Sequence, residues 1–144
     1  MNSQKKIILV DLDHTLYEVD SGNLYPDAID FVKFAQKQNE TYLFTEGDHN
    51  FQKNKIEKTG LDKIFGKNIR IYDEFLKIEN SKKEFSDKDV ILIDDKPLVI
   101  DGAISLGWET IRIKRGRYKN KDSQLKPNNT VKDLQTIVSG NLLL

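Results

Sequence analysis

The chain has 144 residues and a formal net charge of zero at pH 7, because 23 basic residues balance 23 acidic ones. This balance gives no overall field that would favour a nucleic acid or a membrane surface as partner, and the absence of cysteine excludes disulfides and thiol chemistry. No apolar stretch is long enough for a signal peptide or a membrane span, so we expect a soluble, cytoplasmic protein. The length fits one domain, residues 1–144, with its own hydrophobic core.

Strand and helix signals alternate along the first half of the chain. The continuous run of β-branched and leucine residues at 7–10 predicts a central parallel strand that is covered on both faces. Pro26 opens an expected helix with apolar residues at helical spacing, and a second strand is expected at 41–45. Asp48 is expected to cap a helix that runs through residue 58 and ends at Gly60.

The second half continues this alternation. A short strand is expected at 69–72, a helix at 78–85 and a buried strand at 90–93. Pro97 opens a helix over 98–106 that ends at Gly107, and a strand at 109–113 and a helix at 131–138 complete the chain. This order predicts an α/β fold, with a doubly wound, mostly parallel sheet of about five strands and helices on both faces.

Acidic residues follow two of the expected strands. Asp11 and Asp13 come after the strand at 7–10, and Asp94 and Asp95 come after the strand at 90–93. The carboxyl ends of parallel strands share one edge of the sheet, where open α/β sheets bind their ligands. Four carboxylates at this edge would destabilise one another's ionised forms unless a cation lay among them. Oxygen ligands without cysteine favour Mg²⁺, which is therefore the expected cofactor.

The same residue types suit phosphoryl transfer. A carboxylate can attack phosphorus to form an aspartyl phosphate, and a second acid can protonate the leaving oxygen and then activate water. Thr45 can supply a hydroxyl, and Lys77 a positive charge, to orient the phosphoryl group. The alternative for each acidic pair is structural, because Asp11 and Asp13 also suit a turn and the other pair could cap the helix that opens at Pro97.

Four segments in order carry a resemblance to a known family. These segments are Asp11-Leu12-Asp13-His14-Thr15, Phe44-Thr45-Glu46-Gly47, Lys77 and Ile93-Asp94-Asp95-Lys96-Pro97. They resemble the four motifs of the haloacid dehalogenase-like (HAD) superfamily, most of whose members are Mg²⁺-dependent phosphohydrolases with a Rossmann-like core. The stretch from Gly47 to Phe65 also resembles the segment after the second motif in many such phosphatases.

The resemblance assigns a role to each acidic residue. It implies that Asp11 is the nucleophile and Asp13 the general acid and base. It also implies that Mg²⁺ is bound by Asp11, by the backbone carbonyl of Asp13 and by Asp95. Asp94 is expected to lie behind the metal ligands and to orient Lys77.

Further residues complete the expected site. Thr45 and Lys77 are the other catalytic residues, and Thr15, Glu46 and Gly47 are expected to contact the substrate.

Lys82 and Lys83 are alternatives to Lys77 as the lysine of the third motif, because they are nearer in sequence to Asp94. Lys77 is favoured, because a lysine at the start of the helix points toward the sheet edge. The chain departs from many relatives at Val99, where they carry a further aspartate.

Two other groups of residues have an open role. His14 and His49 are expected to face solvent or substrate and not a metal. A run of six basic residues surrounds Tyr118, and it suits either a solvated loop or an anionic ligand such as a polynucleotide. The run consists of Arg112, Lys114, Arg115, Arg117, Lys119 and Lys121.

The intervals between the motifs are too short for a cap domain, so the resemblance implies a capless enzyme with an open site. Such a site suits a macromolecular phosphate ester or a phosphoprotein, or a small molecule if a second subunit of a homo-oligomer supplies the lid. We expect a Mg²⁺-dependent phosphomonoesterase that acts through an aspartyl phosphate. The alternatives are a phosphate-binding or regulatory module of the same fold with little turnover, and a nucleic-acid end phosphatase.

Overall fold

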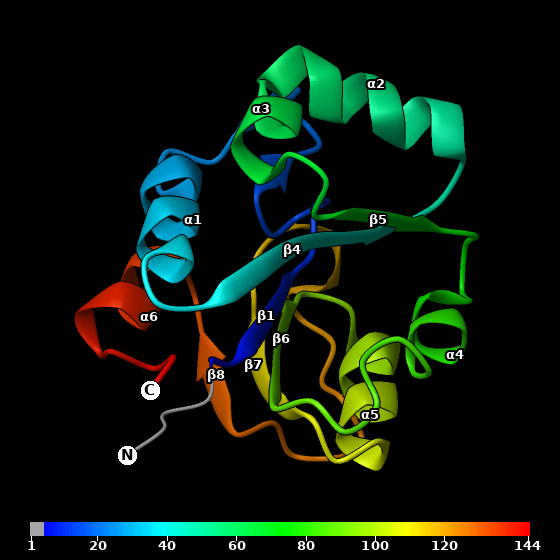
Figure 1. Cartoon of the computed structure of the whole chain (residues 1–144). Helices are drawn as coiled ribbons and strands as arrows, with labels where there is room; N and C mark the ends of the chain where they lie inside the picture. Colours follow the sequence, from blue (N-terminus) through cyan, green and yellow to red (C-terminus); the bar gives the residue numbers. More distant parts are fainter. Residues whose placement is uncertain (1–4) are drawn as a thin grey trace.

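The computed structural model describes residues 5–144, which form a central sheet between layers of helices (Figure 1). The strands are β1 (Ile7–Val10), β2 (Tyr17–Glu18), β3 (Asn23–Leu24), β4 (Glu40–Glu46), β5 (Ile69–Tyr72), β6 (Val90–Asp94), β7 (Glu109–Ile113) and β8 (Asn129–Val131). The α-helices are α1 (Ala28–Gln36), α2 (His49–Thr59), α3 (Leu61–Phe65), α4 (Lys77–Ser81), α5 (Pro97–Ser105) and α6 (Leu134–Ser139), and η1 (Gly116–Tyr118) is a 3₁₀ turn.

The main sheet has the strand order β5-β4-β1-β6-β7-β8, and all of its strand pairs are parallel. β1 lies between β4 and β6, with Val10 aligned to Leu43 on one side and to Ile93 on the other. This arrangement confirms the predicted doubly wound α/β fold. It also places the carboxyl ends of β4, β1 and β6 next to one another.

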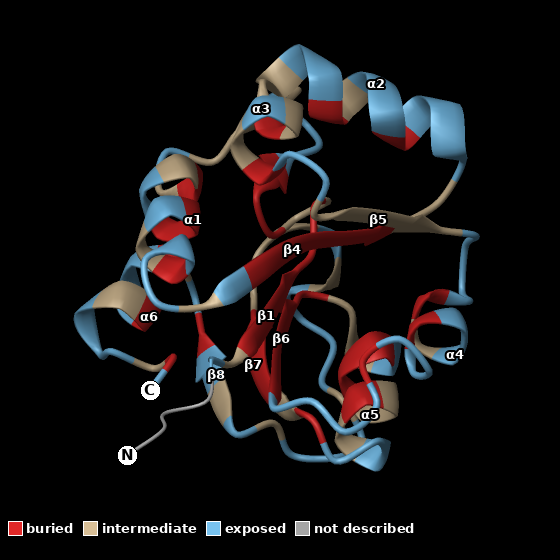
Figure 2. Cartoon of the chain, viewed as in Figure 1, coloured by how far each residue is buried: buried red, intermediate tan, exposed pale blue. Residues whose placement is uncertain are grey.

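Both faces of the sheet are covered, which explains the continuous apolar run of β1. Ile8 and Val10 pack in a core cluster with residues of α1, α3 and α6, whereas Ile7 and Leu9 pack in a second cluster with residues of α5. Figure 1 shows α1 and α6 on one side of the sheet and α4 and α5 on the other. The central strands are buried throughout, and the helices are buried mainly along one side (Figure 2).

Several predicted helix ends are confirmed. The Asp48 side chain accepts a hydrogen bond from the Phe51 backbone N–H and caps α2, which ends at Gly60 in a left-handed conformation with φ of 79°. Pro97 is the first residue of α5, as expected from its fixed φ and missing N–H.

The prediction for the C-terminal region is wrong at its start. Val131 belongs to the short strand β8, which pairs with β7, and the helix begins only at Leu134. The boundary arises because the Asp133 side chain accepts a hydrogen bond from the Thr136 backbone N–H and caps α6. The main sheet therefore has six strands where about five were predicted, and the small antiparallel hairpin β2–β3 is an additional element.

The helix predicted at 78–85 is also shorter than expected. α4 ends at Ser81, and Asp87 in the following turn has a positive φ of 62°. Phe85 lies outside the helix but is still buried, and its ring contacts those of Tyr42 and Trp108 edge to face. The apolar signal at this position therefore reflects core packing and not helix continuation.

The intervals between the four motifs hold only small elements. The hairpin β2–β3 and α1 lie between Asp13 and Thr45, and α2, α3 and β5 lie between Thr45 and Lys77. Within residues 5–144, none of the helices combines the length and the apolar character that crossing a membrane requires.

Candidate active site

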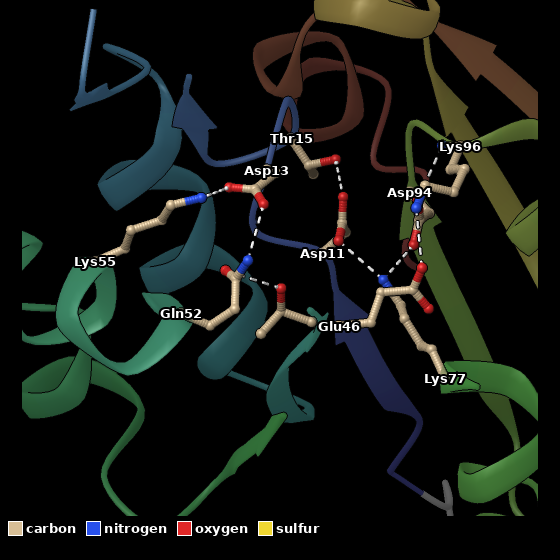
Figure 3. Close-up of polar contacts among 10 residues, drawn as sticks. Asp11, Asp13, Thr15, Glu46, Gln52, Lys55, Lys77, Asp94 and Lys96 are labelled. Atoms are coloured by element: carbon tan, nitrogen blue, oxygen red, sulfur yellow. Dashed lines mark hydrogen bonds and ion pairs between the residues drawn. The ribbon is translucent and has the colours of Figure 1, made fainter. Parts of the chain in front are cut away.

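Most of the predicted site residues lie at the carboxyl ends of three neighbouring strands. Asp11 directly follows β1, Asp94 ends β6, and Thr45 and Glu46 end β4. Because β1 lies between the other two strands, their side chains converge on one place (Figure 3).

Asp11 is buried, and both of its carboxylate oxygens accept hydrogen bonds (Figure 3). Lys77 Nζ donates to Oδ1 at 2.8 Å, and Thr15 Oγ1 donates to Oδ2 at 3.1 Å. Burial alone would raise the pKa of Asp11. The charge of Lys77 and hydrogen bonds from Asp95, Lys77 and Thr15 outweigh burial and hold this pKa below its usual value. Asp11 is therefore ionised at neutral pH, as a nucleophile must be.

Lys77 is the one lysine of the three considered for the third motif that reaches Asp11. It begins α4 and is 1% exposed, and its Nζ also lies 2.7 Å from Asp94 Oδ2. Burial by itself lowers the pKa of Lys77, but the charges of the two carboxylates raise it well above its usual value, so the ammonium stays charged. Lys82 and Lys83 are exposed. Lys77 thus lies where the sequence predicts, in contact with Asp94.

Three carboxylates gather around this lysine. Asp11, Asp94 and Asp95 are buried, and one oxygen of each lies within 4.8 Å of the others. Burial and the charge of Asp11 raise the pKa of Asp94 to about 6. Burial and the charges of both neighbouring acids raise the pKa of Asp95 to about 11. Asp95 Oδ2 is buried and has no hydrogen-bond partner among residues 5–144. One lysine cannot neutralise three carboxylates, so the cluster fits an added cation.

The donor set fits a hard divalent cation such as Mg²⁺. All three groups are carboxylates, and neither histidine belongs to the cluster. Two of its members, Asp11 and Asp95, are expected metal ligands. The third, Asp94, is expected to act behind them, and the backbone carbonyl of Asp13 stays a predicted ligand.

The carboxylate of Asp13 is held by helix α2. Lys55 Nζ donates to its Oδ1 at 2.8 Å, and Gln52 Nε2 donates to its Oδ2 at 3.2 Å (Figure 3). The Thr45 hydroxyl in turn donates to Gln52 Oε1 at 3.5 Å. Gly47 permits this close approach, because a Cβ there would lie 2.9 Å from Gln52 Nε2. Gln52 and Lys55 carry no predicted role, since their sequence positions alone do not reveal the contact with Asp13.

A cavity of about 250 Å³ opens onto the carboxylate cluster. Glu46 and Gly47 line it, and Glu46 Oε2 lies 2.9 Å from Lys96 Nζ. Thr15 is fully buried and is not part of the lining; its hydroxyl contacts Asp11 instead. The other lining residues are Asp11, Asp13, His14, Thr45, Asp48, Phe51, Gln52, Glu74, Lys77, Asp94, Asp95, Lys96, Arg117 and Tyr118.

Comparison with solved structures finds proteins with the same architecture and little sequence identity. A protein from Burkholderia xenovorans, named as a haloacid dehalogenase-like hydrolase, matches with a TM-score of 0.84 and 15% identity, over 98% of this chain and 100% of its own. The chain has the fold of the haloacid dehalogenase-like hydrolases. The resemblance seen in the motifs is thus confirmed at the level of the fold. No protein-family model and no curated protein matches the sequence.

Proteins of different activity share this HAD-like fold. L-2-haloacid dehalogenase from Xanthobacter autotrophicus matches with a TM-score of 0.72 and 9% identity, over 95% of this chain and 99% of its own. A protein from Haemophilus somnus, named as a predicted phosphoglycolate phosphatase, matches with a TM-score of 0.66 and 17% identity, over 83% of this chain and 57% of its own. The shared fold therefore does not by itself select a reaction for this chain.

The two histidines occupy different surroundings. His14 lines the cavity and has a positive φ of 65°. His49 is exposed at the start of α2, where its Nε2 lies 3.7 Å from Asp73 Oδ1.

Half of the basic run is engaged within the protein. Arg112 is buried and donates to two backbone carbonyls of the following loop. Lys114 pairs with Asp122, and Arg115 pairs with Asp27. These three residues organise the loop after β7. The exposed remainder of the run is Arg117, Lys119 and Lys121.

Proposed function

We propose that the protein is a capless, Mg²⁺-dependent phosphomonoesterase that acts through an aspartyl phosphate on Asp11. The observation that carries this proposal is the buried cluster of Asp11, Asp94 and Asp95 around the single charge of Lys77. Such a cluster supports cation binding, and phosphoryl transfer is a reaction in which a cation offsets the charge of the transferred group.

Each residue has a task in the proposed reaction. Ionised Asp11 attacks phosphorus and displaces the alcohol, and water later cleaves the aspartyl phosphate. Asp13 protonates the leaving oxygen in the first step and takes a proton from water in the second. The charge of Lys77 and the hydroxyl of Thr45 orient the phosphoryl oxygens. Asp11, Asp95 and the Asp13 carbonyl would hold Mg²⁺, which would supply positive charge beside the phosphoryl group.

Dehalogenation is the competing reaction for this fold, since one similar structure is an L-2-haloacid dehalogenase. Displacement of a halide also uses a carboxylate nucleophile. A haloacid carboxylate and a phosphate ester would meet the same three acidic side chains and one lysine, so the charge of the site does not separate the two reactions. Halide release from a 2-haloacid, measured beside phosphate release, separates the two reactions.

The decisive experiment compares wild-type protein with Asp11→Asn on a generic aryl phosphate, with Mg²⁺ present or removed by a chelator. We expect turnover only for wild type with Mg²⁺. Asp30→Asn is the matched control, because it removes an exposed carboxylate from α1 and should leave turnover intact. Equal activity of Asp11→Asn and wild type would show that Asp11 is not the nucleophile.

The alternative of a phosphate-binding or regulatory module predicts bound phosphate and no Mg²⁺-dependent turnover across a panel of phosphate esters. A nucleic-acid end phosphatase is less favoured, because three of the six basic residues are engaged within the protein. A phosphoprotein substrate, a lid supplied by a second subunit and the expected cytoplasmic location stay predictions.

A further inference from the structure

A second cavity adjoins the candidate active site. Its volume is about 780 Å³, against about 250 Å³ for the cavity at the carboxylate cluster. It is lined by residues of the β2–β3 region and of the loop that follows β7. His14 and Arg117 line both cavities, so the two cavities adjoin at these residues.

The walls of the second cavity are fixed by specific contacts. The Arg115 guanidinium bonds both carboxylate oxygens of Asp27, at 3.1 and 3.2 Å, and lies 3.6 Å from the centre of the Tyr25 ring. Gly116 has a φ of 77°, and a Cβ there would lie 2.4 Å from His14 Nδ1. The loop therefore sits directly against His14, at the junction of the two cavities. These contacts make the cavity a preformed feature of the fold.

The loop wall carries two positive charges without partners. Arg117 and Lys119 are exposed, and neither has an ion-pair partner anywhere in residues 5–144. The adjacent Lys114 and Arg115 differ, because each is paired with an aspartate. An anionic group of a ligand can thus form charge-assisted hydrogen bonds with Arg117 and Lys119 without breaking an existing pair.

The hairpin wall offers acceptors. Glu18 and Asp20 line the same cavity, are exposed and have no ion-pair partner among the described residues. Carboxylates accept hydrogen bonds from hydroxyl groups, so this wall suits a polyhydroxylated part of the ligand.

We propose that the second cavity binds the alcohol part of the phosphomonoester substrate, and that this part carries hydroxyl groups and a second anionic group. The reacting phosphate lies beside Asp11, the alcohol part passes His14 and Arg117, and its second anion meets Arg117 and Lys119. This inference rests on the proposed function, since it assigns the substrate of the same site.

Calorimetric binding tests the inference independently of turnover. The two probes are fructose 1,6-bisphosphate and fructose 1-phosphate, which differ only in the second phosphate. Binding is measured with the Asp11→Asn variant in the presence of Mg²⁺, so that neither probe is hydrolysed. We expect the bisphosphate to bind about tenfold more tightly than the monophosphate, an advantage that weakens as salt is raised. Adding Arg117→Gln and Lys119→Gln should reduce the advantage to about twofold, the statistical factor for a ligand with two phosphates.

Two further variants serve as controls for this test. Lys33→Gln with Lys37→Gln removes the same charge from exposed positions of α1 and its end, and should keep the tenfold ratio. Arg117→Lys with Lys119→Arg preserves the charge and should also keep it. Equal affinity for both probes in the protein with Arg117 and Lys119 intact would overturn the inference. So would an equal loss of affinity for both probes when these two residues are replaced by glutamine. The proposed function fails separately, through absence of aryl phosphate turnover.

Discussion

Replacing Asp95 by asparagine is expected to stabilise the metal-free protein and to abolish its response to Mg²⁺. Asp95 is buried beside two other acids, and its Oδ2 has no hydrogen-bond partner in the described part of the chain. Asparagine has the same shape and can still donate a hydrogen bond, but it cannot ionise. The substitution therefore removes the cost of taking up a proton on folding and, with it, a metal ligand.

The magnitude can be worked out from the pKa of Asp95, which burial and the charges of Asp11 and Asp94 raise from 3.8 to about 11. Between these two values, the unfolded chain has released the proton that the folded chain retains. Folding must then take up one proton, so wild-type stability falls by about 1.4 kcal/mol for each pH unit. The penalty is absent below pH 3.8, grows as pH rises, and reaches about 4 kcal/mol at pH 7.

Urea denaturation with a chelator, at pH 5 and at pH 7.5, measures this effect. The gain in unfolding free energy from Asp95→Asn should be about 2 kcal/mol at the lower pH and about 5 kcal/mol at the higher one. At pH 7 the melting temperature should rise by about 10 °C. Mg²⁺ at 100 times its Kd should stabilise wild type by about 2.7 kcal/mol and leave the variant unchanged. An equal gain at both pH values would refute the reasoning, because Asp95 would then not be protonated in the folded protein.

Three other outcomes are expected. Lys77→Met should destabilise the chelated protein by about 3–5 kcal/mol in urea denaturation, because it leaves buried carboxylates without their cation; a loss below about 1 kcal/mol would contradict the buried ion pairs. Gly116→Ala should cost about 2 kcal/mol more than Gly60→Ala, since both glycines have positive φ but only the first would place a Cβ against His14; equal losses would argue against that contact. Chelation should stop aryl phosphate turnover, and Mg²⁺ should restore it with no change in circular dichroism; activity that survives full chelation would argue against a metal-dependent reaction.

The sequence alone predicts much of the sheet edge, because strand order determines which residues meet there. The runs at 7–10 and 90–93 are apolar enough to indicate central parallel strands, and Asp11 and Asp95 then converge by topology. Lys77 is predicted at the site for a similar reason. It stands at the start of the helix that follows β5, and the start of such a helix lies at the carboxyl edge of the sheet.

Other features depend on contacts that periodicity does not encode. Lys55 reaches Asp13 across 42 positions, and Arg115 reaches Asp27 across 88. To predict these contacts, one would need to know the positions of two distant segments of the chain to within the length of a hydrogen bond. β8 is missed for a different reason, because a three-residue strand with Val131 as its one apolar residue gives almost no alternating signal.

The central place of β1 has a consequence for synthesis. β1 leaves the ribosome well before β6, yet its two neighbours in the sheet are β4 and β6. Until residues 90–94 emerge, one edge of the apolar strand Ile7–Val10 has no hydrogen-bonding neighbour, and such edges pair readily with other chains. A chain truncated before Val90 should therefore aggregate. It should also lack affinity for a metal ion, because β6 carries Asp94 and is directly followed by Asp95.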